Sequence, residues 1–411
     1  MTLRMHQAYK DLIDKAYQSH EKNRSPEGIT ADDITQARLY SYAFRLHTIG
    51  TFHATGIALL ERPATDPLAA ANRQRAVDGL QDLADQAMEP IPEDFRVVVS
   101  TLYRYHRSVL RVIESLEGDY RASRDPEIER VVQRFAEIIQ EITANNGIHL
   151  TRDVEAPKQA SFVVPNLGIT IVPLVYGDHH SWNLAHLGGE ERNVPTHRHR
   201  QGVEIHLGYN PTHGKTVLGR YRASIDEGYA MPIPPNTDHG WVNTSDEIHH
   251  VPFIFGSLKH SGWGVFLDVI PQQQSVEEIT TEVDRESPSL SQMTYLEREI
   301  SKLEGMPSSW RSTLIPYTVT NREGSGGLEL SLTRINSAGY SFDVDDFRIV
   351  SVVRGEGSVQ IEGVEREVKA HDHFGIPGGL QTRVTQSGTQ PMVVLDSVIK
   401  TLSSKRPGRS W

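Results

Sequence analysis

The sequence predicts an α+β protein in which an N-terminal helical bundle is followed by two antiparallel β-barrels of the jelly-roll type. Up to about residue 150, apolar residues recur every three or four positions, as in amphipathic helices. From about residue 155 they form short β-branched runs separated by Gly, Pro and Asn, as in strands. The expected parts are a helical domain at 1–150, a first barrel at 155–272, a helical connector at 273–312, a second barrel at 313–400 and a flexible tail at 401–411.

Length and composition limit what the protein can do. Its 411 residues suffice for two or three domains, and its formal net charge of -11 argues against nucleic acid as the main partner. Because the chain has no cysteine, disulfides, thiolate metal sites and cysteine nucleophiles are excluded. The N-terminus lacks an apolar signal core, and no stretch approaches the ~20 apolar residues that span a bilayer. We therefore expect a cytoplasmic protein with no membrane partner.

The last helix of the bundle has the clearest boundaries. Asp125 is placed to cap its start, Pro126 suits its first turn, and Gly147 ends it. Four amphipathic helices in sequence can bury one another, and we expect this bundle to form the interface of a homodimer or a wall over the first barrel. No Glu-x-x-His pair occurs among the ring side chains of these helices, which are interpreted as packing residues: His47, His53, Tyr105 and His106.

Eight short strands are expected in the first barrel, enough for the two sheets of a jelly roll. They are predicted at 163–164, 169–175, 182–187, 203–207, 216–221, 231–234, 251–255 and 263–269.

A group of metal-binding residue types falls within this barrel. His197 and His199 are two positions apart, so on a strand their side chains share a face. Glu204 follows, and His239 comes after a strand-rich interval. His199 and Glu204 are an odd number of positions apart, so on one regular strand their side chains would point to opposite faces. A β-bulge between Arg200 and Glu204 is one explanation of how both could face the same site. Three imidazoles and one carboxylate suit Fe(II), Mn(II), Zn(II), Ni(II) or Co(II), and one divalent ion per chain is predicted.

The surrounding sequence resembles the first motif of the cupin superfamily, G-x5-H-x-H-x3/4-E-x6-G. The match covers His197, His199 and Glu204, whereas Glu191 and Pro211 stand where the family has glycine. Neighbouring glycines on both sides suggest a slightly longer turn and an intact site.

The second cupin motif, G-x5-P-x-G-x2-H-x3-N, is matched at Gly228, Pro234, His239 and Asn243. Asn236 takes the place of the family's central glycine, a mild change because asparagine tolerates the left-handed conformation. The resemblance implies a jelly-roll barrel with a bound metal.

Residues near the C-terminus also resemble cupin turns, at Gly355-Glu356-Gly357 and at 375–379, which implies a bicupin. Counting from these turns places non-ligating sets at the metal positions: Ser341, Asp343, Arg348 and Thr382. A separate His-x-His, His371-Asp372-His373, is interpreted as having no metal role. The second barrel is therefore predicted to be structural and free of metal.

Three functions remain open, because cupin resemblance implies fold and ligands more firmly than reaction. The first is an Fe(II) dioxygenase acting on a small oxygenated organic molecule, with Fe(II) as the preferred metal. Aromatic residues near the barrel fit a substrate held away from water: Trp182, Tyr209, Phe253, Phe255 and Trp263.

The second function is a metal-dependent sugar or sugar-acid isomerase, epimerase or lyase, and the third is a metal-stabilised binding protein without turnover. A polar neighbourhood supports the second: His179, His180, His186, Arg198, Arg200, Gln201, His206, Lys259 and His260. On a regular strand His206 shares the face of Glu204, so these two are the predicted catalytic residues, with His206 as the acid–base group.

Overall fold

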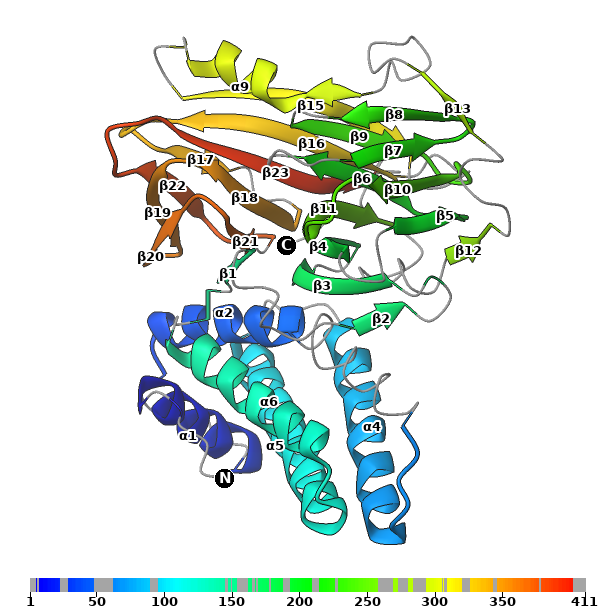
Figure 1. Cartoon of the computed structure of the whole chain (residues 1–411). Helices are drawn as coiled ribbons and strands as arrows, with labels where there is room; N and C mark the ends of the chain where they lie inside the picture. Colours follow the sequence, from blue (N-terminus) through cyan, green and yellow to red (C-terminus); the bar gives the residue numbers. More distant parts are fainter. Residues whose placement is uncertain are drawn as a thin grey trace. The chain divides into compact units, whose positions relative to one another are not determined.

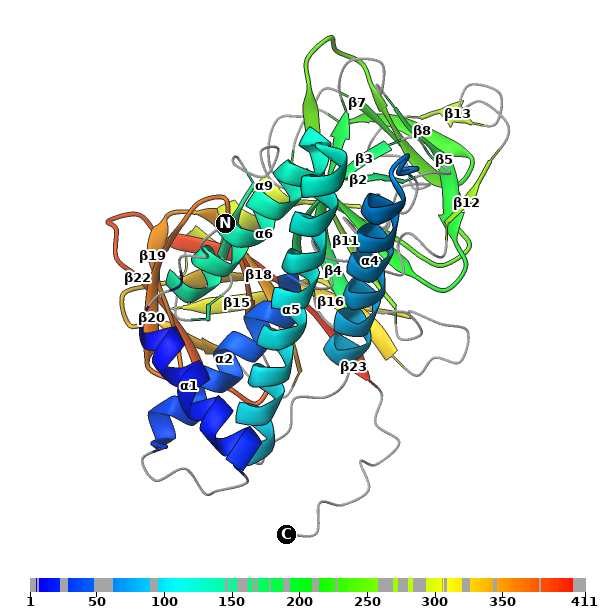
Figure 2. The same cartoon turned by 90° about the horizontal axis from the view of Figure 1, so that it is seen from below.

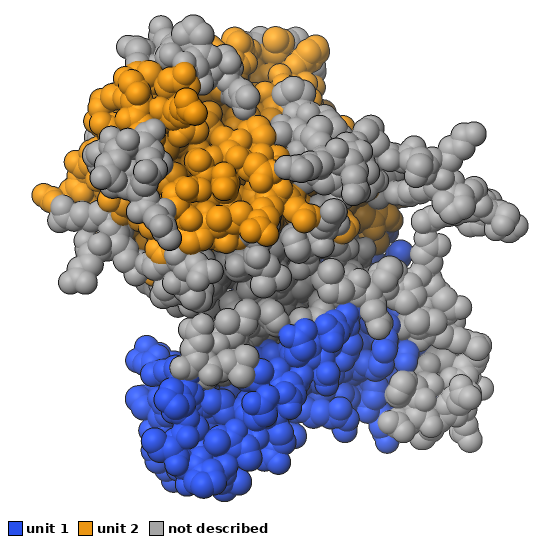
Figure 3. All heavy atoms as spheres, turned by 90° about the vertical axis from the view of Figure 1, so that its right-hand side faces the viewer, with its two compact units in different colours: residues 1–150, 158–162, 362–366 blue, residues 151–157, 163–361, 367–411 orange. Residues whose placement is uncertain are grey.

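The computed structural model describes residues 5, 7–22, 29–47, 62–88, 95–144, 147–148, 150–153, 162–164, 167, 169–176, 179–187, 193–208, 214–225, 228–257, 269–272, 280–283, 293–304, 306, 309–319, 326–342, 346–376 and 378–401. The chain divides into two compact units (Figure 3). Unit 1 comprises 1–150, 158–162 and 362–366, and unit 2 comprises 151–157, 163–361 and 367–411. The predicted fold class is confirmed, because helices precede a set of antiparallel sheets.

Unit 1 is built around one long helix. Its helices in the described part of the chain are α1 Gln7–Lys22, α2 Ala31–His47, α4 Pro67–Met88, α5 Phe95–Ser123 and α6 Pro126–Ala144. Helix α5 packs against the other four (Figures 1 and 2). Each helix buries an apolar stripe against these neighbours, which is how an amphipathic sequence gains stability. None of the described helices has the length and apolarity of a membrane-spanning segment.

Helix α6 begins and ends where the sequence predicts. The backbone N–H of Glu127 donates to Oδ1 of Asp125 at 3.0 Å, so Asp125 caps the helix. At the other end Gly147 adopts φ +82°, and its N–H donates to the carbonyl of Ile142 at 3.0 Å. A left-handed glycine that satisfies a carbonyl of the last turn ends the helix without a steric penalty.

Two buried polar contacts hold α5 to its neighbours. Nε of Arg73 lies 2.8 Å from Oδ2 of Asp119, and the hydroxyl of Tyr9 lies 3.1 Å from Nδ1 of His106. Burial lowers the pKa of His106 to about 4, so this imidazole is neutral near pH 7. These contacts agree with a packing role for His106, whereas the side chain of His47 and all of His53 lie outside the described residues.

The first half of unit 2 contains two sheets (Figure 1). Their strands are β2 Phe162–Val164, β3 Ile169–Tyr176, β4 His180–Leu187, β5 Asn193–His199, β6 Val203–Gly208, β7 Gly214–Leu218, β8 Tyr221–Ile225, β9 Tyr229–Ile233, β10 His239–Asn243, β11 His249–Gly256, β12 Val269–Pro271, β13 Thr281–Glu282 and β14 Thr294–Tyr295. The seven-stranded sheet has the order β14-β9-β6-β11-β4-β3-β2, and the six-stranded sheet has the order β12-β5-β10-β7-β8-β13.

The second half repeats this arrangement. Its elements are β1 Leu150–Arg152, α9 Leu296–Glu304, β15 Trp310–Val319, β16 Gly326–Ile335, β17 Tyr340–Phe342, β18 Arg348–Arg354, β19 Glu356–Ile361, β20 Val364–Lys369, β21 Asp372–Ile376, β22 Thr382–Gln386 and β23 Met392–Thr401. The order β21-β18-β23-β16-β15 parallels β9-β6-β11-β4-β3, and β17-β22-β19-β20 parallels β5-β10-β7-β8. The two halves therefore share one strand order.

Some strands differ from the expectations. The strand expected at 216–221 is a hairpin of β7 and β8, which turns at Gly219 with φ +59°. Strands β5 and β10 are absent from the eight predicted ones, because polar histidines occupy inward positions and hide the apolar alternation. Of the strand expected at 263–269, residues 263–268 lie outside the described part of the chain.

The expected connector is only partly separate from the barrels. Helix α9 lies in it, but β13 pairs with β8, and β14 pairs with β9. These short strands extend both sheets of the first half at their edges. Residues 402–411 of the expected tail lie outside the described residues.

A buried group of charges lies inside the second half. The carboxylate of Asp396 accepts from Arg348 at 2.6 Å and from Arg311 at 2.8 Å. Arg311 also lies 3.3 Å from Glu329, whose other oxygen is 2.6 Å from Lys400. Removing one member of such a network leaves its partner buried and unpaired. The resulting loss of stability exceeds the net stabilisation that the intact network provides.

We predict that Asp396→Asn lowers the free energy of unfolding by about 3–5 kcal/mol, because Arg348 and Arg311 lose their shared carboxylate in a buried site. Urea denaturation followed by tryptophan fluorescence measures the change. Glu367→Gln removes an exposed carboxylate of β20 and serves as the control, with an expected effect within about 0.5 kcal/mol. Equal stability of the two variants would contradict the prediction.

Candidate metal centre

The four predicted ligands come from two facing sheets of the first half. His197 and His199 lie on β5, and His239 opens β10, which pairs with β5 so that His239 stands opposite His197. Glu204 lies on β6 in the other sheet, opposite Phe255 of β11. The structure brings all four together, with the donor atoms within 4.8 Å of one another.

The chain passes from one sheet to the other between His199 and Glu204. This change of sheet, and not the suggested β-bulge, explains how two residues an odd number of positions apart face the same site. Strand β5 ends at His199 and β6 begins at Val203. Gly202 makes this bend possible, because a Cβ there would lie 2.1 Å from the ring of Phe255. Both His199 and Glu204 can then point into the space between the sheets.

The turn before His239 fixes the bend. Asn236 adopts φ +62°, which confirms that asparagine takes the left-handed conformation at the position of the family's glycine. Its backbone N–H donates to the carbonyl of His199 at 2.6 Å, and its side-chain amide donates to the carbonyl of Arg200 at 3.3 Å. This turn thereby links the segment that carries His197 and His199 to the segment that carries His239.

Backbone carbonyls set the orientation of two imidazoles. Nδ1 of His197 lies 2.8 Å from the carbonyl of Pro195, and Nδ1 of His239 lies 2.9 Å from the carbonyl of Thr237. A carbonyl can only accept, so each Nδ1 carries the proton and each Nε2 presents its lone pair. Metal-binding histidines are oriented in this way.

The contacts of Glu204 have the dimensions of a metal site. Its Oε2 lies 2.9 Å from Nε2 of His199 and 3.4 Å from Nε2 of His239. Two ligand atoms that are each about 2.1 Å from one ion at a right angle are about 3 Å apart. Nε2 of His239 is buried and, among the described residues, has no hydrogen-bond partner, an arrangement that a bound cation would satisfy. The donor set therefore fits a divalent metal.

Electrostatics in the cluster also favour a cation. Burial alone would raise the pKa of the Glu204 carboxyl, but the imidazoles of His239, His199 and His206 bring it well below its ordinary value. Burial lowers the pKa of His197 well below the usual range, and the neighbouring His239 and His199 lower it further. A neutral imidazole and an ionised carboxylate are the protonation states in which these side chains bind metals.

His206 lies beside the four ligands on β6. Its Nε2 is 2.7 Å from Oε1 of Glu204, and its buried Nδ1 has no hydrogen-bond partner among the described residues. Glu204 and His206 therefore share a face, as the strand periodicity predicts. The carboxylate that contacts His199 and His239 with one oxygen contacts His206 with the other.

The equivalent position in the second half carries the opposite charge. Glu204 pairs with Ile233 of β9, and Arg348 pairs with Ile376 of β21, so Arg348 corresponds to Glu204. Thr382 stands opposite Phe342 as His239 stands opposite His197. Counting along the sequence had placed Ser341 at the position that Phe342 occupies. Among the residues that the structure describes, no metal-type cluster occurs in the second half.

The second His-x-His belongs to a structural contact. Asp372 is fully buried and pairs with Arg152 at 2.7 Å. His371 and His373 lie 3.2 and 3.4 Å from the carboxylate of Asp153. These pairs attach the segment around β1 to β21, a contact that could not be predicted because the partners are more than 200 residues apart in the sequence.

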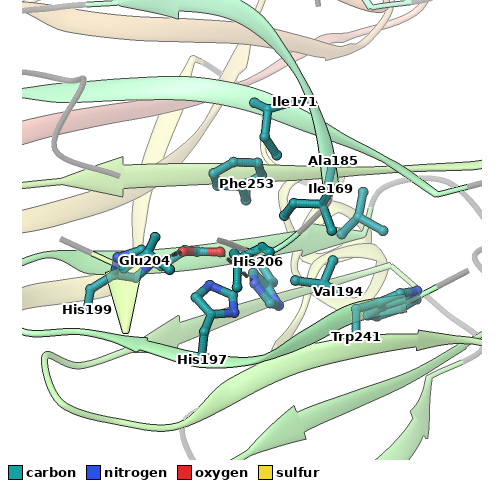
Figure 4. A pocket seen from close by; sticks show the side chains of 13 residues that line it. Ile169, Ile171, Ala185, Val194, His197, His199, Glu204, His206, Trp241 and Phe253 are labelled. Carbon is teal, nitrogen blue, oxygen red and sulfur yellow. Dashed lines mark hydrogen bonds and ion pairs between the residues drawn. The ribbon is translucent and has the colours of Figure 1, made fainter. Parts of the chain in front are cut away.

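A pocket opens over the metal cluster between the two sheets (Figure 4). His197, His199, Glu204 and His206 line one part of it, whereas His239 is fully buried and is not among the lining residues. The remaining lining residues are hydrophobic: Leu167, Ile169, Ile171, Ala185, Val194, Trp241, Val251, Phe253 and Val269. The site thus has a single polar region surrounded by hydrocarbon.

The aromatic residues expected near the barrel have different locations. Phe253 lines the pocket, and the ring of Phe255 packs on His199 with centroids 5.0 Å apart. Trp182 instead packs on His373, toward the second half. Tyr209 and Trp263 lie outside the described residues.

Most of the expected polar neighbourhood faces away from the pocket. Nε2 of His180 contacts the carbonyl of Ser397 in the second half at 3.2 Å, and His186 contacts His250 at 3.0 Å. Arg198 lies 4.0 Å from Asp238. Of that group only His206 lines the pocket within the described part of the chain, while Lys259 and His260 lie outside it.

Comparison with known proteins gives weak likenesses. No family model matches the chain, and no curated protein matches it. Among solved structures, salicylate 1,2-dioxygenase from Pseudoaminobacter salicylatoxidans with gentisate has a TM-score of 0.41 and 13% identity, over 55% of this chain and 72% of that one. A Cupin 2 conserved barrel domain protein from Leptotrichia buccalis has a TM-score of 0.36 and 14% identity, over 56% of this chain and 89% of that one. Likenesses of this size carry no conclusion about activity.

We predict that His197→Ala, His199→Ala and His239→Ala each abolish stoichiometric metal, because each removes one of four ligands. Glu204→Ala should weaken binding less, since three imidazoles remain. Elemental analysis of purified protein measures the metal, with about one ion per chain expected for the unchanged protein.

A matched control replaces His371 and His373 with alanine, since this His-x-His lies outside the cluster and its variant should keep the metal. Full occupancy in His239→Ala, or loss of metal in the control, would contradict the assignment.

Proposed function

We propose that this chain is a metal-dependent enzyme of the cupin type, and that it acts as an Fe(II) dioxygenase on a small oxygenated organic substrate. The observation that supports this most directly is the buried group of His197, His199, Glu204 and His239 beside a hydrophobic pocket. The same strand order in both halves supports a duplicated barrel, of which the first half keeps the metal ligands. The sequence motifs at these residues point to the same superfamily.

Nitrogen and oxygen ligands without thiolate are compatible with iron, and four protein ligands leave one or two positions open. When bound, Fe(II) supplies the Lewis acidity and one-electron chemistry that oxygenation of an organic molecule requires. The protein's part is to hold the ligands, exclude water and orient the substrate. Hydrophobic walls on both sheets serve the second and third of these tasks.

The isomerase or lyase alternative receives less support from the pocket. Sugars and sugar acids carry several hydroxyl groups, and enzymes bind them through side chains that donate and accept hydrogen bonds. Outside the metal cluster and His206, the described lining residues are hydrophobic. A binding protein without turnover also remains an alternative, which only a measured reaction distinguishes from the proposed enzyme.

We predict that the protein purified from its expression host contains iron, and that it consumes oxygen when a small enol or phenol substrate is added. Elemental analysis identifies the metal, and an oxygen electrode measures uptake against a panel of such compounds. His239→Ala is the matched control, which should show neither iron nor uptake. Turnover without oxygen consumption, with Mn, Zn, Ni or Co bound, would instead support the isomerase or lyase alternative.

We assign His206 to the chemistry beside the metal, because it lines the pocket and contacts Glu204. His206→Ala is expected to keep the metal and to lower kcat by about 10²–10⁴-fold, the usual contribution of an acid–base group. His206→Gln is the comparison, since it can still donate to Glu204 but cannot take up a proton. Loss of metal in His206→Ala that is restored in His206→Gln would show that His206 only positions Glu204.

A further inference from the structure

The pocket has one polar region, and nothing polar lies opposite it among the described residues. On the seven-stranded sheet, Ile171, Ala185 and Val251 are cross-strand neighbours on β3, β4 and β11, and all three face the pocket. Val194 and Val269 contribute hydrocarbon from the other sheet (Figure 4). Among the described lining residues, apart from the indole N–H of Trp241, a ligand that enters meets its polar partners at the metal cluster.

The nearest arginines along the chain point away from this pocket. Arg198 lies between His197 and His199 on β5, so strand alternation turns it to the opposite face. Its side chain is 41% exposed and lies 4.0 Å from Asp238. Arg200 is exposed in the bend after β5. Neither is placed to pair with an anionic group on a ligand inside the pocket.

The charge of the loaded site sets a second limit. A divalent ion with the Glu204 carboxylate and neutral imidazoles has a net charge of +1, so one anionic oxygen on the ligand would neutralise it. A second anionic group, directed away from the metal, would lie against Ile171 and Val251 without a counter-ion. Burying an unpaired charge in such a place costs several kcal/mol. Each buried hydroxyl left without a partner weakens binding as well.

We propose that the substrate is a compact, largely hydrocarbon molecule whose polar atoms are confined to the metal end, where it binds as a neutral or singly anionic oxygen ligand. This inference rests on the metal centre of the proposed function, and it names the substrate class of that site. Polyhydroxy acids and molecules with a second carboxylate are excluded by the same argument.

The test compares two ligands with the same catechol head, 4-methylcatechol and 3,4-dihydroxybenzoate, which differ by a methyl group against a carboxylate. Protein loaded with Zn(II), which has no redox chemistry, is titrated by calorimetry under nitrogen after its metal content has been measured. We expect 4-methylcatechol to bind at least about tenfold more tightly, and D-gluconate to bind more weakly than either.

A variant pair checks that the hydrocarbon wall causes the preference. Ile171→Lys places a cation at the apolar part of the pocket and should reduce or reverse the preference, whereas the size-matched Ile171→Met should retain it. Should the lysine variant fail to fold, the ligand comparison on the unchanged protein still decides the question.

The outcomes separate this inference from the proposed function. A protein that takes up no Zn(II) contradicts the metal centre itself. Loaded protein that binds both catechols equally, prefers the carboxylate, or binds neither overturns the substrate class. Selective binding without oxygen uptake by the iron form leaves the substrate class standing and contradicts the dioxygenase proposal.

Discussion

The site depends on one carboxylate, Glu204, that is buried among imidazoles. Burying an ionised carboxylate is costly unless hydrogen bonds and opposite charge compensate it. Here one oxygen faces His199 and His239, and the other faces His206. His206 lies on the same strand as Glu204, whereas His199 on β5 and His239 on β10 belong to the other sheet, so the carboxylate connects two sheets that no ladder of backbone hydrogen bonds joins among the described strands.

The two halves of unit 2 carry opposite charges at corresponding buried positions. In the first half the position on β6 is the carboxylate of Glu204, which is surrounded by imidazole nitrogens. In the second half the corresponding Arg348 on β18 is a buried guanidinium, and Asp396 on the neighbouring β23 compensates it at 2.6 Å. The permanent charge of Arg348 neutralises the buried Asp396 carboxylate. Among the described residues, the second half keeps the strand order of the first half and contains no metal-type cluster.

The sequence predicted the cluster of four residues better than it predicted the strands around it. Ligand spacing and turn residues are local, so the resemblance to the cupin motifs was enough to select His197, His199, Glu204 and His239, which the structure brings together. Strands β5 and β10 were not among the predicted strands, because inward-facing histidines of the cluster replace the apolar residues on which strand prediction relies. The change of sheet at Gly202 could not be read either, because it depends on the ring of Phe255, which lies more than 50 residues away.

Most of the nine polar residues near the motif are expected to be solvated rim residues, with His206 as the one beside the metal. Strand alternation and pairing direct His180, His186 and Arg198 away from the pocket. What reaches the interior is decided by the register of β3, β4 and β11, which brings Ile171, Ala185 and Val251 side by side. Among the described lining residues the polar side chains are concentrated in the cluster, so these residues recognise mainly one end of a ligand. Discrimination among ligands then depends on the shape of the ligand and on the energetic penalty for burying a second polar group. Both effects come from the hydrophobic lining residues and do not depend on which metal is bound.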